Sequence, residues 1–364
     1  MNERLEQLIS QLVDQSIQAA IITNPKHVYY LSGFRSDPHE RLLALIVTAD
    51  GTSKLLVPEL DRAGAEAAAS VDRIESHRDT DDAYAILARM LGTSAVGTLA
   101  IEKERVTVSQ FERLKSVLPQ ASLSGIDDAL LAMRAVKSTD EVERIKHAVQ
   151  LIEQVLRDTL PLVKPGVTEL ELAADIDFRM RKIGAEGPSF DTTVLAGANS
   201  ALPHGSPGNR RIAEGELLLF DMGVYADGYV SDITRTFAVG EISDELKRIY
   251  EVVLEANRLG IQALKPGIPM LEADLAARRQ IESYGYGERF THRLGHGIGL
   301  DIHEYPSLHG ANTDRLRPGM VVTVEPGIYV PNLGGVRIED DVLITNDGAQ
   351  SLTTFPKELT IIGV

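Results

Sequence analysis

The chain has no cysteine among its 364 residues, which excludes disulfide bonds and thiolate metal sites. It also has no low-complexity tract and no apolar run near the roughly 18 residues that a membrane-spanning helix requires. Positive charge is scarce: 37 Lys and Arg stand against 53 Asp and Glu, a net charge of −16. This balance argues against a nucleic-acid-binding surface, which should be basic. Because the charged amphipathic N-terminus does not resemble a signal peptide, we expect a cytoplasmic protein without membrane or nucleic-acid partners.

The length and the order of predicted elements indicate two domains. Short apolar strands and amphipathic helices alternate over the first 125 or so residues, which is typical of an α/β domain. Residues 127–160 predict one or two long helices, with Ser138 or Thr139 as an N-cap. We therefore expect an α/β domain at residues 1–127 and a second domain at residues 128–364.

The second domain contains an internal duplication. Residues 215–223 and 319–327 are each a glycine, an apolar strand, an acid and a glycine, and the two acids, Asp221 and Glu325, are 104 residues apart (325 − 221). Lys-Pro-Gly at residues 164–166 recurs at residues 265–267, before a helix-like stretch in each copy. This period is too long for a solenoid, so we expect two matching α+β halves.

Each half carries a second acid on its next strand, Asp232 in the first and Glu339 in the second. The segment Gly295–Gly299 adds His296, where glycines allow a close approach of the backbone. Four carboxylates and one imidazole form an oxygen-rich set that suits Mn²⁺, Co²⁺ or Fe²⁺ better than a structural zinc. Two such ions about 3.5–4 Å apart can activate a shared water, so the pattern predicts a dinuclear metallohydrolase.

These motifs resemble those of the creatinase/aminopeptidase P/prolidase metallopeptidases, whose catalytic domain has the pita-bread fold. The resemblance covers essentially the full length, since a separate N-terminal α/β domain is also a family feature. It rests on five motifs: Leu219–Gly223, Ser231–Thr236, His292–Gly299, Val324–Tyr329 and Gly335–Asp341.

The resemblance implies a role for each ligand. Asp221 would serve one ion and His296 with Glu325 the other, while Asp232 and Glu339 would bridge the pair. The expected cofactor is two divalent ions per chain, Mn²⁺ first, with Co²⁺, Fe²⁺ and Zn²⁺ as alternatives. Glu325 is also the family's usual candidate for the base that accepts the proton of the attacking water.

The resemblance further implies that histidines at three motif positions line the substrate pocket: His204, His292 and His303. We expect His204 and His303 to assist the tetrahedral intermediate. Arg293 and Arg337 are candidates to bind a substrate carboxylate, because a guanidinium grips one with two parallel hydrogen bonds. For Arg293 a surface ion pair is the alternative, and Arg337 could instead orient a metal-bound carboxylate. Tyr329 is either pocket lining or a strand tyrosine packed at the rim.

The leading interpretation is a prolidase, which cleaves Xaa-Pro dipeptides. Aminopeptidase P, which takes longer peptides with proline second, is the nearest alternative. The long N-terminal domain argues against methionine aminopeptidase, and the complete ligand set argues against creatinase and against a non-catalytic binding module.

The charged segment 35–41 lies between two apolar stretches of the first domain. It is either a solvated hairpin loop or a contact to a second subunit. Dimers of the resembled family bring the N-terminal domain of one subunit near the catalytic cleft of the other, so we expect a homodimer in which this loop reaches the partner's site.

Overall fold

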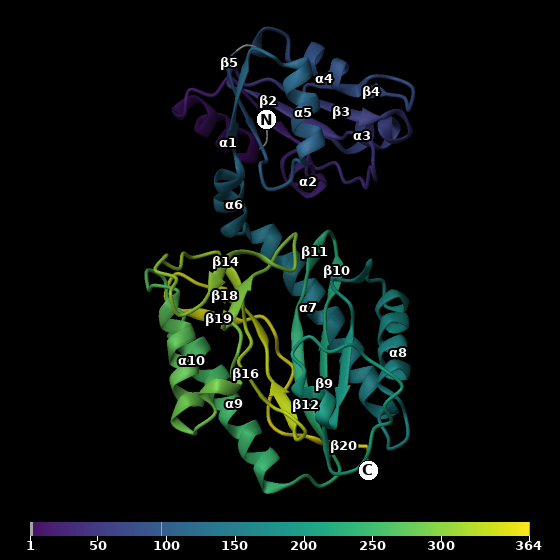
Figure 1. The fold of residues 1–364 in the computed structure, drawn as a ribbon, viewed down its shortest axis with the longest axis vertical. Coiled ribbons are helices and arrows are strands. Elements are labelled where there is room, and N and C mark those ends of the chain that lie inside the picture. Colours follow the sequence, from purple (N-terminus) through teal and green to yellow (C-terminus); the bar gives the residue numbers. More distant parts are fainter. Residues whose placement is uncertain (1–2, 96, 364) are drawn as a thin grey trace. The chain divides into compact units, whose positions relative to one another are not determined.

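The computed structural model describes residues 3–95 and 97–363 of the chain. They form two compact units, Met1–Met133 and Arg134–Val364 (Figure 1). The division falls within helix α6 (Asp127–Ala135), a few residues after the boundary expected at residues 127 and 128. That boundary stays a prediction, and residues 1, 2 and 364, at the outer ends of the expected domains, lie outside the described residues.

The first unit is built on a six-stranded mixed sheet in the order β4-β3-β2-β1-β5-β6. Strand β1 pairs in parallel with β5 and antiparallel with β2, while β3 and β4 pair in parallel. The expected α/β class of this unit is therefore confirmed. Its strands are β1 (Ala19–Ile22), β2 (Ala44–Thr48), β3 (Ser53–Pro58), β4 (Arg73–His77), β5 (Gly97–Ile101) and β6 (Ala121–Gly125).

The helices of the first unit begin at residues suited to that position. Asn24 caps α2 by accepting a hydrogen bond from the amide of Lys26, and Pro25 occupies the first helical position. Thr107 and Gln110 form a reciprocal capping box at the start of α5. The helices are α1 (Glu3–Asp14), α2 (Pro25–Ser32), α3 (Arg62–Ala68), α4 (Ala83–Leu91) and α5 (Val108–Val117), with short 3₁₀ turns η1 (Glu59–Asp61) and η2 (Gly92–Ala95).

The second unit consists of two halves with matching helices. Ser138 caps α7 and Ser243 caps α9, and each serine accepts a hydrogen bond from the residue three positions on. Helix α8 lies on one flank and α9 with α10 on the other, with strands of both halves between them (Figure 1). The helices are α7 (Thr139–Thr159), α8 (Glu169–Lys182), α9 (Asp244–Ala263) and α10 (Leu271–Ser283), with η3 (Leu160–Leu162), η4 (Gly197–Ala201) and η5 (Gly287–Arg289).

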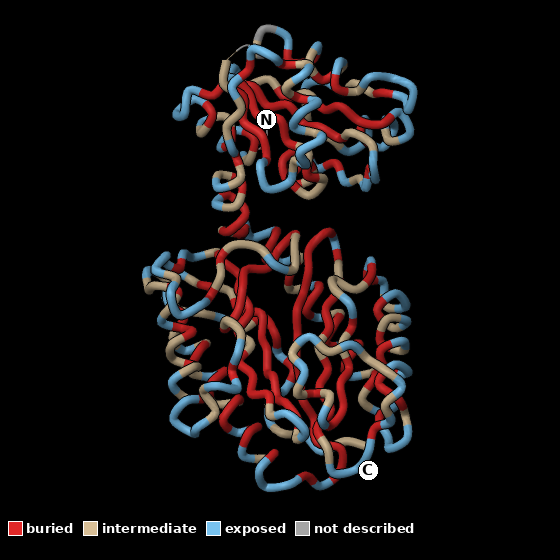
Figure 2. The backbone as a smooth tube through the Cα atoms, viewed as in Figure 1, coloured by how far each residue is buried: buried red, intermediate tan, exposed pale blue. Residues whose placement is uncertain are grey.

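The strands of the second unit are buried along most of their length, as the tube in Figure 2 shows. The first half contributes β7 (Gly187–Pro188), β8 (Thr193–Ala196), β9 (Glu216–Met222), β10 (Val224–Ala226), β11 (Tyr229–Val230) and β12 (Ile233–Val239). The second half contributes β13 (Gly295–Gly297), β14 (Glu304–Leu308), β15 (Val321–Val324), β16 (Gly327–Val330), β17 (Gly334–Arg337), β18 (Asp340–Ile344), β19 (Ala349–Ser351) and β20 (Ile361–Ile362). This duplicated architecture confirms the expected pita-bread fold.

Strand β9 decides where the first carboxylate of the site points. It lies inside a four-stranded sheet, in the order β20-β12-β9-β8. Side chains alternate along a strand, so Leu218 and Phe220 join the core under α7 and α8 while Leu217 joins the core of the second half. Asp221 shares the face of Leu217 and is thereby directed toward the second half.

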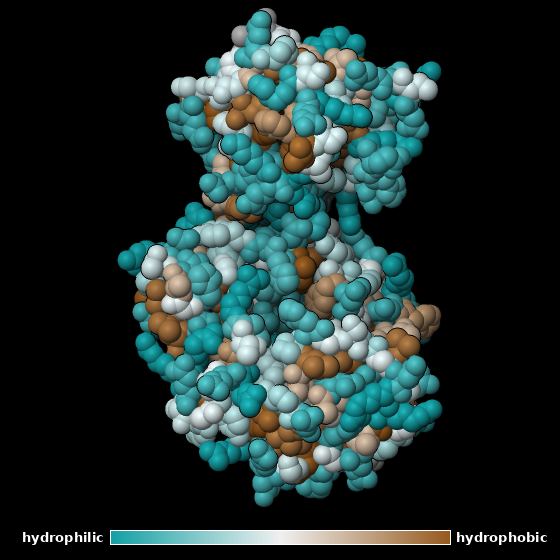
Figure 3. All heavy atoms as spheres, viewed as in Figure 1, coloured by the Kyte–Doolittle hydropathy of each residue, from teal (hydrophilic) through white to brown (hydrophobic). Residues whose placement is uncertain are grey.

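The surface of the molecule is predominantly hydrophilic on the face drawn in Figure 3, where apolar residues are dispersed in small groups. Within residues 3–95 and 97–363, no helix is both long enough and apolar enough to cross a membrane.

Candidate metal centre

The two halves of the second unit bring their carboxylates to one place. Asp232 precedes β12, and Glu339 lies between β17 and β18. Asp232, His296 and Glu339 each offer a ligand atom, and these three atoms lie within 4.8 Å of one another. Buried side chains that converge in this way, from segments more than 40 residues apart, are suited to hold a cation.

Glu325 and Asp221 border the same group. The Oε1 atom of Glu325 lies 3.3 Å from Nε2 of His296, and Oδ2 of Asp232 lies 3.8 Å from that nitrogen. Asp221 stands opposite Thr234 in the pairing of β9 with β12. All five residues that the sequence suggests as ligands line one cleft.

The backbone and a threonine hold the two buried acids in place. The amide of Glu339 donates to the carbonyl oxygen of Thr234 at 3.1 Å, and Thr234 Oγ1 donates to Glu339 Oε2 at 2.6 Å. The amide of Asp232 donates to Asp341 Oδ2 at 3.0 Å. Each acid is therefore oriented by the other half of the duplication.

Electrostatics indicate that this group of acids requires a positive partner. Burial is the main cause that raises the pKa of Asp232 and of Glu339 well above the usual range, and neighbouring carboxylates raise both further. Burial would also raise the pKa of Glu325, but its hydrogen bond with His296 and the charge of that ring lower it to about 2. A bound cation would favour the ionised form of both acids and so offset this effect of burial.

The donor set fits divalent cations. Asp232 Oδ1 is buried and has no hydrogen-bond partner among the described residues, a state that costs free energy unless a cation is bound. Carboxylate oxygens with one imidazole are ligands that Mn²⁺, Co²⁺ and Fe²⁺ accept. Asp221, Asp232, His296, Glu325 and Glu339 would hold such ions.

A hydrogen-bonded chain runs behind the acids. Arg337 donates from Nη2 to Asp221 Oδ2 at 2.5 Å, from Nη1 to Tyr329 Oη at 3.0 Å and from Nε to Thr234 Oγ1 at 3.1 Å. The Tyr329 hydroxyl also lies 2.8 Å from Nε2 of His292. Tyr329 is buried, and whether it lines the substrate pocket or only packs in its strand stays a prediction.

The cleft has a volume of about 580 Å³, within the range of about 300–1,000 Å³ usual for small-ligand sites. The other predicted site residues, His204, His292, Arg293 and His303, line it together with Arg337. The ring of His303 meets that of His296 edge to face, with centroids 4.2 Å apart. Although His303 is exposed to the cleft, desolvation and then the charge of His296 lower its pKa to about 4.

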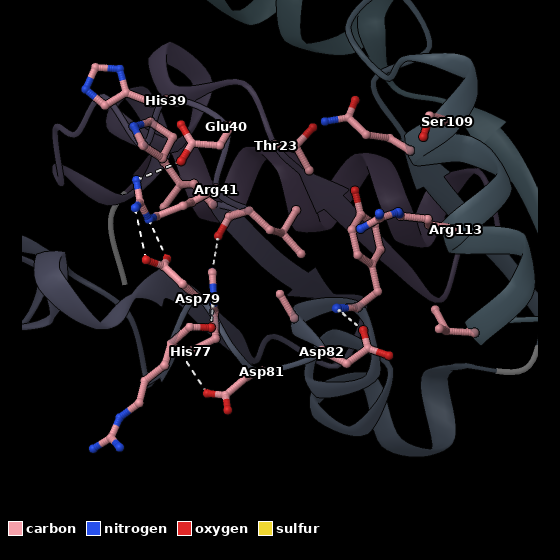
Figure 4. Close-up of a pocket in the computed structure, with 18 of the residues that line it drawn as sticks. Thr23, His39, Glu40, Arg41, His77, Asp79, Asp81, Asp82, Ser109 and Arg113 are labelled. Carbon is pink, nitrogen blue, oxygen red and sulfur yellow. Dashed lines mark hydrogen bonds and ion pairs between the residues drawn. The ribbon is translucent and has the colours of Figure 1, made fainter.

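The predicted loop 35–41 lies in the first unit, beside a cavity of about 1,070 Å³. Arg41 grips Asp79 through two hydrogen bonds, at 2.7 and 3.1 Å, and His39 points away from them (Figure 4). The side chains of Asp37 and Glu40 in this loop are 81% and 76% exposed, as expected for a charged loop on the surface. Contact between loop 35–41 and the active site of a partner subunit stays a prediction.

Several residues that support the site carry little signal in the sequence. Asp341 and Thr234 contact the predicted ligands, and their only signal was alternation, which places them on the same strand faces as Glu339 and Asp232. Glu304, Arg134 and Lys137 form a buried ion cluster next to His303 that had no signal in the sequence.

Comparison with known families identifies both parts of the chain. Residues 143–346 match the model of metallopeptidase family M24, and residues 4–136 match the creatinase/prolidase N-terminal domain. An uncharacterized peptidase of Staphylococcus aureus strain USA300 is 42% identical over 354 residues, 97% of this chain and 99% of that protein.

Two solved structures are similar over nearly the full length. The prolidase from Pyrococcus horikoshii OT3 has a TM-score of 0.92 and 37% identity, covering 98% of this chain and 100% of that one. The X-Pro aminopeptidase from Thermotoga maritima MSB8 has a TM-score of 0.90 and 35% identity, covering 99% of this chain and 100% of that one.

Proposed function

The chain belongs to metallopeptidase family M24, and from this premise we propose that it is a dinuclear-metal dipeptidase cleaving the bond between any residue and a following proline. The observation that carries the proposal is the convergence of Asp232, His296 and Glu339, with ligand atoms within 4.8 Å. The similarity to a prolidase over the whole length supports the choice of substrate.

The five residues named above would hold two divalent ions, Asp232 and Glu339 as bridging ligands. Such ions would supply Lewis-acid polarisation of the scissile carbonyl and a lower pKa for the attacking water. Thr234 and the backbone keep the bridging carboxylates in place, and Arg337 orients Asp221.

Protons are handled by side chains around the cleft. Glu325 is ionised at neutral pH, because its pKa is about 2, and it would be the residue that accepts the proton of the attacking water. His303 is neutral at pH 7, because its pKa is about 4, and its ring N–H can donate a hydrogen bond to the oxyanion. His204, on the rim of the cleft, would share this role.

Recognition of a dipeptide requires a cation for its free carboxylate. Arg293 lines the cleft and donates from Nη1 to Ser307 Oγ at 3.1 Å, while no carboxylate among the described residues is paired with it. Arg337 already makes three hydrogen bonds within the protein and is therefore less available to bind a substrate carboxylate. Arg293 is therefore the better candidate to hold the substrate carboxylate.

The test is a peptide panel of Xaa-Pro dipeptides and Xaa-Pro-Xaa tripeptides, assayed after reconstitution with Mn²⁺. We expect a higher kcat/KM for dipeptides, with the Asp232→Asn variant as the inactive control. Hydrolysis of no proline peptide by the metal-loaded chain would refute the proposal.

Aminopeptidase P is the second candidate, because the chain is about as similar to an X-Pro aminopeptidase as to a prolidase. Tripeptides cleaved with kcat/KM equal to or above that of dipeptides would establish it instead. A purified chain with no bound metal would point to the non-catalytic binding module.

The identity of the metal ion, the oligomeric state and the cellular location are also part of the proposal. Mn²⁺ is the proposed ion, and metal analysis after purification without chelator tests it against Co²⁺, Fe²⁺ and Zn²⁺. A homodimer in the cytoplasm is proposed, and light scattering at micromolar concentration tests the dimer.

A further inference from the structure

A cluster of two cations and two acids, buried except for the partly exposed Asp301, lies directly behind the segment that carries His303. Glu304, the residue after His303, is only 3% exposed, and its Oε1 accepts a hydrogen bond from Lys137 Nζ at 2.9 Å. Its Oε2 accepts a hydrogen bond from Arg134, which also donates to Asp301 Oδ2 at 2.7 Å. The cluster thus balances two positive and two negative charges.

Both cations are themselves held rigidly. The side chain of Arg134 is 4% exposed and that of Lys137 is 1% exposed. The backbone amide of Lys137 donates to the carbonyl oxygen of Gly319 at 2.8 Å, and Val136 pairs with Met320 as a β-bridge. These contacts anchor the segment between α6 and α7 to the second half of the unit.

The segment on the other side has little regular structure of its own. Residues 298–303 connect β13 to β14, and the pairing of these strands shifts register next to His296. Glu304 Oε2 accepts the amide of Asp301 at 3.3 Å, closing a small turn around His303. Gly299 leaves room for this carboxylate, since a Cβ there would lie 2.7 Å from Glu304 Oε1.

We propose that Arg134 and Lys137 are positioning residues that hold His303 beside His296 through the Glu304 carboxylate. Charge-assisted hydrogen bonds in a buried site are short and directional, so the anchored cations fix Glu304, and Glu304 fixes the residue before it. The role of His303 in catalysis rests on the proposed function; the holding of its ring does not.

The activity experiment is a double-mutant cycle on an Xaa-Pro dipeptide with Lys137→Met, His303→Ala and the double variant. Lys137→Met should lower kcat at least tenfold, with KM within twofold and unchanged metal content. The double variant should be no slower than His303→Ala alone within twofold, because one effect passes through the other residue. Losses that multiply would overturn the proposal.

Two further variants control for charge and for general destabilisation. Lys137→Arg keeps the cation and should retain kcat within about threefold. Lys146→Met removes a partly exposed lysine that pairs with the exposed Glu143 and should match the wild type. Because removal of one partner of a buried pair can unfold a protein, Lys137→Met/Glu304→Gln is the second variant, neutral at both positions, with the same expected loss of kcat.

A readout without catalysis separates this proposal from the proposed function. In the Zn²⁺-loaded chain with ¹³C-labelled histidine, the ring signal absent from His303→Ala belongs to His303. That signal should shift or broaden in Lys137→Met while those of His27 and His77 stay in place. An unchanged His303 signal would overturn the proposal, whether or not the chain cleaves proline peptides.

Discussion

Arg337 donates to Asp221 across 116 residues of sequence, at 2.5 Å, and so ties the second half of the duplication to the first. The same guanidinium reaches Tyr329 and Thr234, and its side chain is only 6% exposed. A buried arginine with every nitrogen engaged favours orientation of a metal-bound carboxylate over capture of substrate.

This arrangement predicts a particular kinetic effect of Arg337→Lys. A lysine donates from a single nitrogen and cannot replace hydrogen bonds that Arg337 makes from three separate nitrogens, so metal affinity or kcat should fall about 10–100-fold, as when a partner of a metal ligand is removed. KM should change little. Metal titration by calorimetry and steady-state kinetics measure these effects. A rise in KM alone would instead indicate that Arg337 binds the substrate carboxylate.

Arg293→Met should have the opposite effect. If Arg293 holds the free carboxylate, KM for a dipeptide should rise at least tenfold, because a charge-assisted hydrogen bond of about 1.5–3 kcal/mol is lost. The amidated dipeptide, which has no carboxylate, is the matched control and should be unaffected. Equal effects on both substrates would contradict the assignment.

Asp232→Asn and Glu339→Gln should each abolish activity while the fold is kept. An amide has one oxygen and no charge, so it cannot bridge two cations as a carboxylate does. Circular dichroism and metal analysis accompany the assay. A variant with two bound ions and more than a tenth of the wild-type rate would rule out bridging.

His204→Ala and His303→Ala should keep their metal and lose kcat by about 10²-fold or more, the usual effect of losing an oxyanion donor. The His147→Ala variant is the control, since His147 is 52% exposed and pairs with Asp227 away from the residues that line the cleft. Full activity of the first two variants with full metal occupancy would leave both histidines without a catalytic role.

Removal of the metal should destabilise the protein more at high pH than at low pH. The folded-state pKa values of Asp232 and Glu339 lie well above the unfolded values near 4. Between those limits the metal-free folded state binds more protons than the unfolded state, so its stability falls as pH rises. Bound cations take the place of these protons. We therefore expect the drop in Tm caused by EDTA to grow from pH 5 to pH 8, as measured by calorimetry; a constant drop would contradict it.

Much of the architecture could be inferred from the sequence because its signals are local. Strand and helix periodicity predicted the α/β unit, and the next strand of each half offered a second acid, Asp232 and Glu339. The motif that ends in Asp221 recurs with Glu325 in the same place, which indicates that the second domain consists of two matching halves. The sequence offers both Ser138 and Thr139 as the N-cap of helix α7. In the structure the N-cap is Ser138, which forms a capping box with Glu141.

The tertiary structure decided which of these faces meet. The sequence around Arg337 would look the same whether this arginine binds a substrate or Asp221. Glu304 lies 167 residues from its partner Lys137, so no local pattern links the two. Periodicity describes a single element, whereas ion pairs at such separations depend on how the halves pack and on which charges are buried together. The sequence by itself therefore determined the ligand candidates and the duplicated fold, and packing alone assigned the partners that orient them.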